Sequence, residues 1–155
     1  MLKALIAVDG SAHSLGAVRH VIKLAQEREP LEIHLLNVQP PLPGDVTRFV
    51  DGSVVKSFHD DEAVKALAPA CALLDRAGTP YTKHVVVGHP APTIANWAKK
   101  LNCDKVIMGT RGLGAVSQLL LGSVSHEAIH QMDPRIPVTL VKEGLGNLDE
   151  KKSHE

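Results

Sequence analysis

Short runs of aliphatic residues alternate along the chain with longer segments in which apolar residues recur at helical spacing. Dense aliphatic runs of about four to eight residues, bounded by turn-forming residues, are typical of β-strands. The runs are residues 3–8, 32–38, 82–88, 104–109 and 137–141. Three of them are nearly continuous rather than alternating, as expected for a parallel sheet that is covered on both faces.

The segments between the runs each carry one apolar stripe. The stripes are Leu15, Val18, Ile22 and Ala25; then Ala63, Leu67, Ala70 and Leu74; and then Ile94, Trp97, Ala98 and Leu101. Spacings of three and four residues place each stripe on one face of a helix. Gly78 follows the second stripe, where a glycine commonly ends a helix. Alternating strands and helices predict right-handed crossovers and a layered α/β sandwich.

Ligands of such folds bind beyond the carboxyl ends of the strands, so the loops after the first and fourth strands are the first candidates. Asp9 ends the first strand, and Ser11 is a suitable N-cap for the next helix. Asp9 is either part of this turn or a carboxylate directed at a ribose hydroxyl or a metal. Residues 39–55 form a long, proline-rich connection, which we expect to flank the same cleft.

The loop after the fourth strand is rich in glycine and runs into a serine-rich helix start. The candidate anion contacts in this segment are Gly109, Arg111, Gly112, Gly114, Gly122, Ser123 and Ser125. Glycines let backbone N–H groups approach an anion, and a helix start adds unpaired N–H groups with a partial positive charge. The segment therefore indicates a phosphate site, although a flexible loop followed by an ordinary serine cap has the same composition.

The helix that begins there contains "HEAIH", which matches the H-E-x-x-H signature of zinc peptidases through His126, Glu127 and His130. The helical repeat puts Val124, Ala128, Ile129 and Met132 on the face toward the sheet. Both histidines then point away from it, and a catalytic zinc also needs a third ligand. We favour the phosphate interpretation and keep a zinc-dependent peptidase as an alternative.

Three consecutive acidic residues precede the second apolar stripe. Asp60, Asp61 and Glu62 are expected near the start of that helix. Acidic side chains favour a helix N-terminus, where the partial charge is positive, so capping is their predicted role.

Composition narrows the class of protein. The 155 residues suit one domain, and Lys+Arg and Asp+Glu balance at 17 each, so no charge excess favours nucleic acid or an anionic membrane as a partner. Cys71 and Cys103 form no C-x-x-C spacing and are expected as reduced thiols. We see no signal peptide and no run of about 20 apolar residues, so the expected location is the cytoplasm.

The spacing Gly109-x2-Gly112-x9-Gly122-Ser123 resembles the G-2x-G-9x-G-(S/T) nucleotide loop of the universal stress protein family. The resemblance extends over "ALIAVDGS", "IHLLNV", "VGHP", "DKVIMGTRGLG" and "IPVTLV". It implies a three-layer sandwich with a five-stranded parallel sheet, order 3-2-1-4-5, helices on both faces, and an adenine nucleotide alpha hydrolase-like fold. It also implies a family domain over residues 1–143, a polar tail over 144–155, and a homodimer through the last strand, Ile136 to Val141.

The resemblance further implies ATP as the ligand, with or without Mg²⁺, and a role in stress response through nucleotide occupancy. By this resemblance, Asp9 matches the position that contacts the ribose. Val38 matches a residue whose backbone contacts the adenine, and Met108 and Gly109 match residues that border the sugar. The phosphate cradle is matched by Gly112, Gly122, Ser123, Val124 and Ser125; Arg111 lies inside the motif without defining it. Slow ATP hydrolysis is the alternative function.

Overall fold

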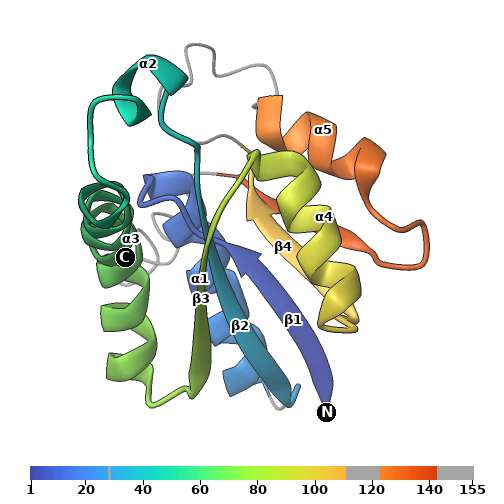
Figure 1. Ribbon diagram of the computed structural model, residues 1–155. Helices are drawn as coiled ribbons and strands as arrows, with labels where there is room; N and C mark the ends of the chain where they lie inside the picture. Colours follow the sequence, from blue (N-terminus) through green and yellow to red (C-terminus); the bar gives the residue numbers. More distant parts are fainter. Residues whose placement is uncertain (28, 111–122, 143–155) are drawn as a thin grey trace.

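The computed structural model describes residues 1–27, 29–110 and 123–142, and it contains the expected parallel sheet. The strands are β1 (Leu2–Ala7), β2 (Leu31–Gln39), β3 (Tyr81–Val87), β4 (Lys105–Gly109) and β5 (Val138–Val141). All neighbouring strands pair in parallel, in the order β3-β2-β1-β4-β5 (Figure 1). The predicted fold class and strand order are therefore confirmed.

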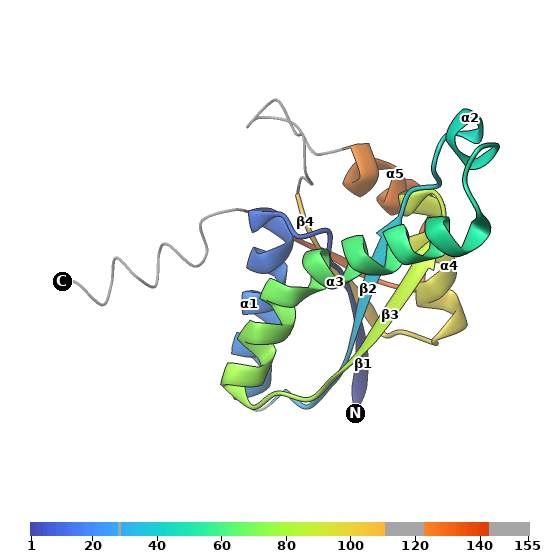
Figure 2. The ribbon, with the colours of Figure 1, turned by 60° about the vertical axis from the view of Figure 1, so that its left-hand side comes forward.

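Helices cover both faces of the sheet. They are α1 (Ala12–Gln26), the short α2 (Gly44–Thr47), α3 (Gly52–Ala77), α4 (Pro90–Lys100) and α5 (Ser123–Gln131). Helices α1 and α3 pack on one face and α4 and α5 on the other (Figures 1 and 2). Side chains alternate along β2, so Leu35 packs in the α1–α3 layer and Leu36 in the α4–α5 layer.

Two helix ends form as the sequence predicts. Ser11 caps α1, because its Oγ accepts a hydrogen bond from the backbone N–H of Ser14 at 3.2 Å. Gly78 ends α3 with a φ of 67°, a left-handed conformation that costs glycine little.

The start of α3 differs from the prediction. The helix begins at Gly52, and the side chain of Asp51 caps it by accepting a hydrogen bond from Ser53 N–H at 3.2 Å. Residues 39–55 are therefore not one open connection, since they contain α2 and the first turn of α3. The predicted capping role of Asp60, Asp61 and Glu62 is wrong, because they lie in the helix interior. Asp60 pairs there with Lys56 at 3.1 Å and Glu62 with Lys65 at 3.3 Å.

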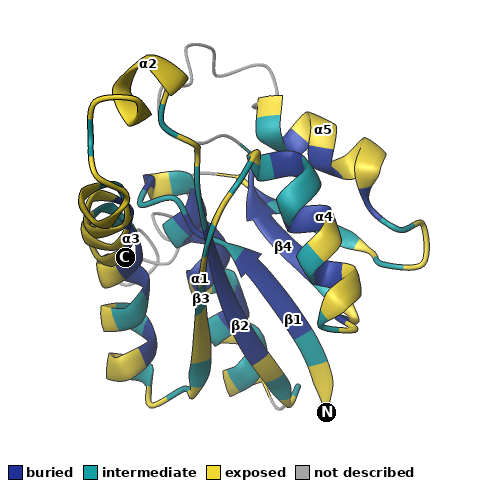
Figure 3. Ribbon diagram, in the orientation of Figure 1, coloured by how far each residue is buried: buried dark blue, intermediate teal, exposed yellow. Residues whose placement is uncertain are grey.

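The orientation of α5 matches the prediction in part. Ala128 and Met132 are buried, and Val124 packs against the same apolar cluster. Ile129 was expected to face the sheet, but its side chain is 41% exposed, so that expectation is wrong. The face of α5 that packs on the sheet is narrower than the predicted stripe (Figure 3).

Two further properties follow from the described residues. Cys71 and Cys103 are free thiols, as expected, and burial raises the pKa of Cys103 to about 11, so this thiol stays protonated at neutral pH. None of the described helices combines the length and the apolar character that a membrane span requires.

Candidate functional site

A pocket lies where β1, β2 and β4 end, at the edge of the sheet that sequence analysis selected. Its walls are Ala7, Val8, Asp9, Ser14, Leu36, Val38, Pro90, Ile94, Met108, Gly109, Val124 and Ser125. Its volume is about 120 Å³, smaller than the roughly 300–1,000 Å³ of clefts that enclose a drug-sized ligand. The described walls therefore fit one end of such a ligand, such as a ring system.

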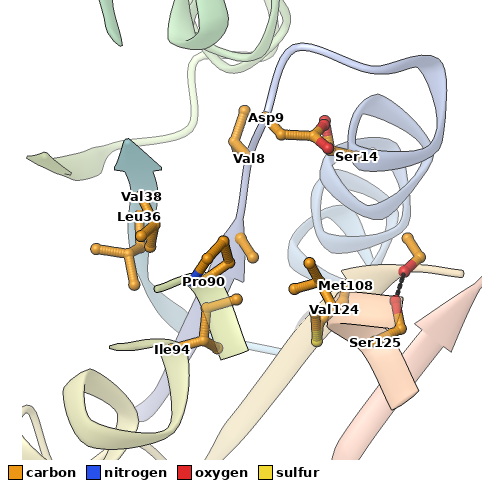
Figure 4. Close-up of a pocket in the computed structure, with 12 residues that line it drawn as sticks. Val8, Asp9, Ser14, Leu36, Val38, Pro90, Ile94, Met108, Val124 and Ser125 are labelled. Atoms are coloured by element: carbon orange, nitrogen blue, oxygen red, sulfur yellow. Dashed lines mark hydrogen bonds between the residues drawn. The ribbon is translucent and has the colours of Figure 1, made fainter. Parts of the chain in front are cut away.

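Three helices begin beside this pocket (Figure 4). Ser14 comes from the first turn of α1, Pro90 from the start of α4, and Val124 from the start of α5. The unpaired N–H groups at a helix start carry a partial positive charge. All three helix starts lie at one sheet edge, which brings their partial positive charges close together.

Asp9 supplies a carboxylate at the end of β1. Its Oδ1 accepts a hydrogen bond from the backbone N–H of Ser11 at 2.9 Å, so the turn before α1 orients the side chain. Gly10 makes this turn possible with a φ of 86°, a conformation that a side chain would strain. The structure thus shows that the turn-forming and cleft-lining interpretations of Asp9 are compatible.

The floor and one wall of the pocket are apolar. Leu36 and Val38 lie on the same face of β2 because side chains alternate along a strand, and Ile94 of α4 closes that side. The opposite face of β2 carries buried Asn37, whose Nδ2 donates a hydrogen bond to the Val8 carbonyl at 2.8 Å. This bond holds the ends of β1 and β2 together beside the pocket.

The end of β4 is held by contacts on both sides. The buried hydroxyl of Ser125 donates a hydrogen bond to the Gly109 carbonyl at 2.9 Å (Figure 4), which fixes the start of α5 against β4. A Cβ at Gly109 would lie 2.6 Å from the backbone carbonyl carbon and oxygen of His13. Gly109 is therefore required for the close approach of α1 to β4, a packing role that the loop motif did not indicate.

The structure brings most of the predicted site residues together. Those that line the pocket are Asp9, Val38, Met108, Gly109, Val124 and Ser125. Ser123 is exposed at the first residue of α5 and is not part of the lining. Arg111, Gly112 and Gly122 lie outside the described residues.

Several wall residues were not predicted. They are Ala7, Val8, Ser14, Leu36, Pro90 and Ile94. The sequence held a signal for two of these residues. Leu36 is two positions from Val38 and therefore lies on the same face of β2. Pro90 lies in the first turn of α4, where proline is favoured, so it marks the start of that helix. The long connection after β2 was expected to flank this pocket, but its residues Pro41, Leu42 and Thr47 line a different groove.

The histidine pair of the H-E-x-x-H match lies on the exposed face of α5. His126 and His130 contact each other edge to face, with ring centroids 4.8 Å apart. Within residues 1–27, 29–110 and 123–142, no three metal-ligating side chains cluster as a site with three protein ligands would require. In the described geometry, the two histidines form an exposed ring pair.

Comparison with known proteins agrees with this architecture. The model of the universal stress protein family matches residues 1–142, and the chain belongs to this family. A universal stress protein of Methanocaldococcus jannaschii is 31% identical over 144 residues, which cover 90% of this chain and 81% of the relative. A universal stress protein of Thermus aquaticus is also 31% identical, over 140 residues that cover 89% of this chain and 96% of the relative.

Solved structures share the fold. The hypothetical protein MJ0577 superimposes with a TM-score of 0.77 at 27% identity, covering 91% of this chain and 95% of that one. A universal stress protein in complex with cAMP has a TM-score of 0.67 at 22% identity, with coverages of 92% and 97%. An Arabidopsis thaliana family member with AMP bound has a TM-score of 0.68 at 17% identity, with coverages of 95% and 95%.

Proposed function

We propose that this chain binds an adenine nucleotide, with ATP as its ligand, in the pocket at the ends of β1, β2 and β4. One observation carries the proposal: six residues selected from the nucleotide-loop resemblance and the strand ends line a single pocket. The cAMP and AMP complexes of similarly folded family members support an adenine ligand.

The base and sugar fit the described walls. Adenine is a flat ring that packs well between apolar side chains, and Leu36, Val38 and Ile94 offer such a surface. A ribose presents hydroxyl donors, and the Asp9 carboxylate beside this surface is an acceptor whose direction its own turn already sets. We therefore place the adenine against β2 and α4 and the ribose at Asp9.

The phosphates are assigned to the helix starts and the glycine motif. Backbone N–H groups at the beginning of α5 are the donors we expect, together with Gly112, Gly122 and Ser123 of the motif. The Ser125 hydroxyl has one hydrogen, and it is donated to Gly109, so its contribution to phosphate binding is through the backbone. Arg111 is a cation of the same segment, and Asp9 is the carboxylate that would hold Mg²⁺.

We propose that the nucleotide acts by occupancy rather than by turnover. Asp9 is the only titratable side chain among the described residues that line the pocket. Hydrolysis needs a group that activates water, and an aspartate already oriented toward a ribose is poorly placed for that task.

Calorimetric titration of nucleotide-free protein tests the binding. We expect ATP to bind, and we expect Val38→Phe to weaken binding at least tenfold because the larger ring fills the adenine wall. Val54→Phe is the matched control, since Val54 is 55% exposed on α3 and lines none of the described pockets. An absence of binding to folded wild-type protein, or equal weakening by both substitutions, contradicts the proposal.

Phosphate release separates occupancy from slow hydrolysis. Wild type and Asp9→Asn are assayed together, with Gly122→Val as a variant designed to block the phosphate cradle. Release at equal rates in all three proteins indicates a contaminating enzyme and leaves occupancy as the function. Release that is lost in both variants establishes the ATPase alternative.

A further inference from the structure

The outer face of α5 carries two histidines one helical turn apart. His126 and His130 are both exposed, and they lie four residues apart within the helix Ser123–Gln131. A helix turns about 100° per residue, so the two side chains leave it only about 40° apart and one above the other. Figure 3 shows exposed positions along the length of α5. Neither histidine lines the pocket at the strand ends.

The separation of the two rings is the one that a shared metal ion would impose. A bond from zinc to an imidazole nitrogen is about 2.0–2.1 Å long, which puts each ring centroid about 3.2 Å from the ion. Two such rings at a ligand–metal–ligand angle of about 90–110° have centroids about 4.5–5.2 Å apart. The ring centroids of His126 and His130 are 4.8 Å apart. The backbone of α5 therefore needs no change to bring both rings to one ion.

Rotation of the exposed rings is enough to direct their nitrogens to the ion. The rings now meet edge to face, with an angle of 74° between their planes. The torsion that turns an imidazole has broad minima, and exposed side chains move within nanoseconds. This rotation leaves each centroid in place, because the bond that turns points through the centre of the ring. One nitrogen from each histidine can thus complete a chelate.

The ligand atoms select the class of ion. Neutral imidazole suits Zn²⁺, Ni²⁺ and Cu²⁺, whereas Mg²⁺ and Ca²⁺ prefer oxygen. Glu127 is exposed at the next position and adds a negative charge that attracts a cation. Two protein nitrogens leave the other coordination positions to water, so this site is open, unlike a structural zinc site with four protein ligands.

The other histidine pair of the described ranges is less suited to an ion. Nδ1 of His34 and Nε2 of His84 lie 2.8 Å apart and are hydrogen-bonded to each other. His34 is only 7% exposed. An ion there would have to replace this bond and enter a covered position, whereas the α5 pair is open to solvent.

We propose that His126 and His130 bind one late transition-metal ion, such as Zn²⁺, Ni²⁺ or Cu²⁺, as a two-nitrogen chelate on α5. The ion bridges successive turns of a helix of nine residues. Helices this short are marginal by themselves, so an ion that binds only the helical form stabilises α5 and the folded protein. The site requires no nucleotide and is independent of the proposed function.

Calorimetric titration of tag-free, nucleotide-free protein with Ni²⁺ tests the site. We expect one Ni²⁺ to bind per chain and to raise the melting temperature, and we expect Mg²⁺ at the same concentration to do neither. An absence of Ni²⁺ binding, or an equal effect of Mg²⁺, overturns the proposal.

Single and double variants separate a chelate from two independent histidines. His126→Gln and His130→Gln should each lower the affinity for Ni²⁺ at least tenfold, because a chelate is lost with either ligand. The double variant should then lose little more. Two small losses that add in the double variant, or binding that survives in it, contradict the proposal.

A variant with an unchanged number of histidines is the matched control. His130→Gln combined with Gln131→His places the two histidines five residues apart, about 140° around the helix, where they cannot share an ion. This variant should bind Ni²⁺ as weakly as His130→Gln alone. His89→Gln, at the exposed start of α4, should leave the affinity unchanged. Wild-type affinity in the exchanged variant, or a tenfold loss in His89→Gln, places the ion elsewhere and overturns the proposal.

Discussion

At the scale of single residues, a few buried hydrogen bonds determine where the strands and helices meet at the pocket. Asn37 joins the ends of β1 and β2, and Ser125 joins β4 to α5. Neither side chain was predicted to have this role: Asn37 was not singled out, and Ser125 was assigned to phosphate. The hydroxyl of a serine at a helix start is equally suited to either partner, so only the packed structure distinguishes them.

We expect Ser125→Ala to lower the free energy of unfolding by about 1–2 kcal/mol, because the buried Gly109 carbonyl loses a hydrogen bond. Urea denaturation of the nucleotide-free protein measures the change. Ser57→Ala on the exposed surface of α3 is the control and should change stability by less than about 0.5 kcal/mol. Equal effects of the two substitutions would show that the Ser125 bond contributes nothing.

A chain of three polar side chains crosses the α4 face of the sheet from β2 to the edge strand β3. Nδ1 of His34 lies 2.8 Å from Nε2 of His84, and Nε2 of His34 lies 3.2 Å from Glu32 Oε1. The bond between the rings needs one protonated and one bare nitrogen, so it is lost when both histidines are fully protonated. Burial, His34 and the facing Lys100 of α4 together lower the pKa of His84.

This lowered pKa predicts that the protein is less stable in mild acid. Histidine in an unfolded chain titrates near pH 6.5. Below that value the unfolded chain takes up a proton that folded His84 resists, so stability is complete above about pH 6.5 and falls as the pH drops toward the folded pKa. Urea denaturation at several pH values should show a weaker decline for His84→Gln than for wild type. Replacement of the exposed His126 by Gln should leave the decline unchanged; a decline identical in all three proteins contradicts the assignment.

At the scale of helices and strands, the sequence predicted the elements whose apolar residues touch the core. All five strands were placed within about two residues of their observed bounds. The first eight residues of α3, before Asp60, were missed because buried residues begin only at His59, while Val54 and Phe58 are exposed. A helix segment that packs against few other residues has no continuous buried face. Its sequence then shows no apolar stripe, and periodicity does not detect it. Asp51, a good N-cap residue, was the local signal available.

Some residues of the candidate site could be predicted from their place in the chain, and others depend on tertiary packing. Gly109 is the last residue of β4 and Asp9 lies two residues beyond the end of β1, so their position in the chain was enough to place them at the sheet edge. Ile94 and Leu36 join the pocket only because α4 crosses the sheet on the face that Leu36 occupies. That choice of face depends on tertiary packing, which a single sequence pattern does not specify.

The start of α3 provides a test at this scale. Asp51→Ala should destabilise the protein by about 1 kcal/mol, because an N-cap hydrogen bond to Ser53 is lost. Thermal or urea denaturation measures the change. Asp61→Ala is the control, since Asp61 is exposed in the helix interior and should matter little. A larger loss for Asp61→Ala would restore the interpretation that the acidic cluster caps this helix.

At the scale of the whole molecule, the sheet formed by the described residues has two edge strands, β3 and β5, with different chemistry. On β3, Lys83 lies beside two exposed valines, Val85 and Val87. β5 is short, and its residues Val138, Thr139 and Leu140 are only half-buried. An unpaired edge with aliphatic side chains favours association with another strand, and a two-fold axis would pair β5 with its own copy. We therefore propose β5 as the homodimer contact.

Sedimentation velocity at micromolar concentration tests which edge associates. We expect a dimer for wild type and a monomer for Val138→Glu and for Leu140→Glu, because each places a charge in an apolar contact without an opposite partner. Val85→Glu at the β3 edge is the matched control and should remain dimeric. Retained ATP binding in the monomeric variants would show that the domain is folded, since the pocket at the strand ends contains no residue of β5. A monomeric wild type contradicts the proposal, and a dimer that only Val85→Glu disrupts would assign the interface to β3 instead.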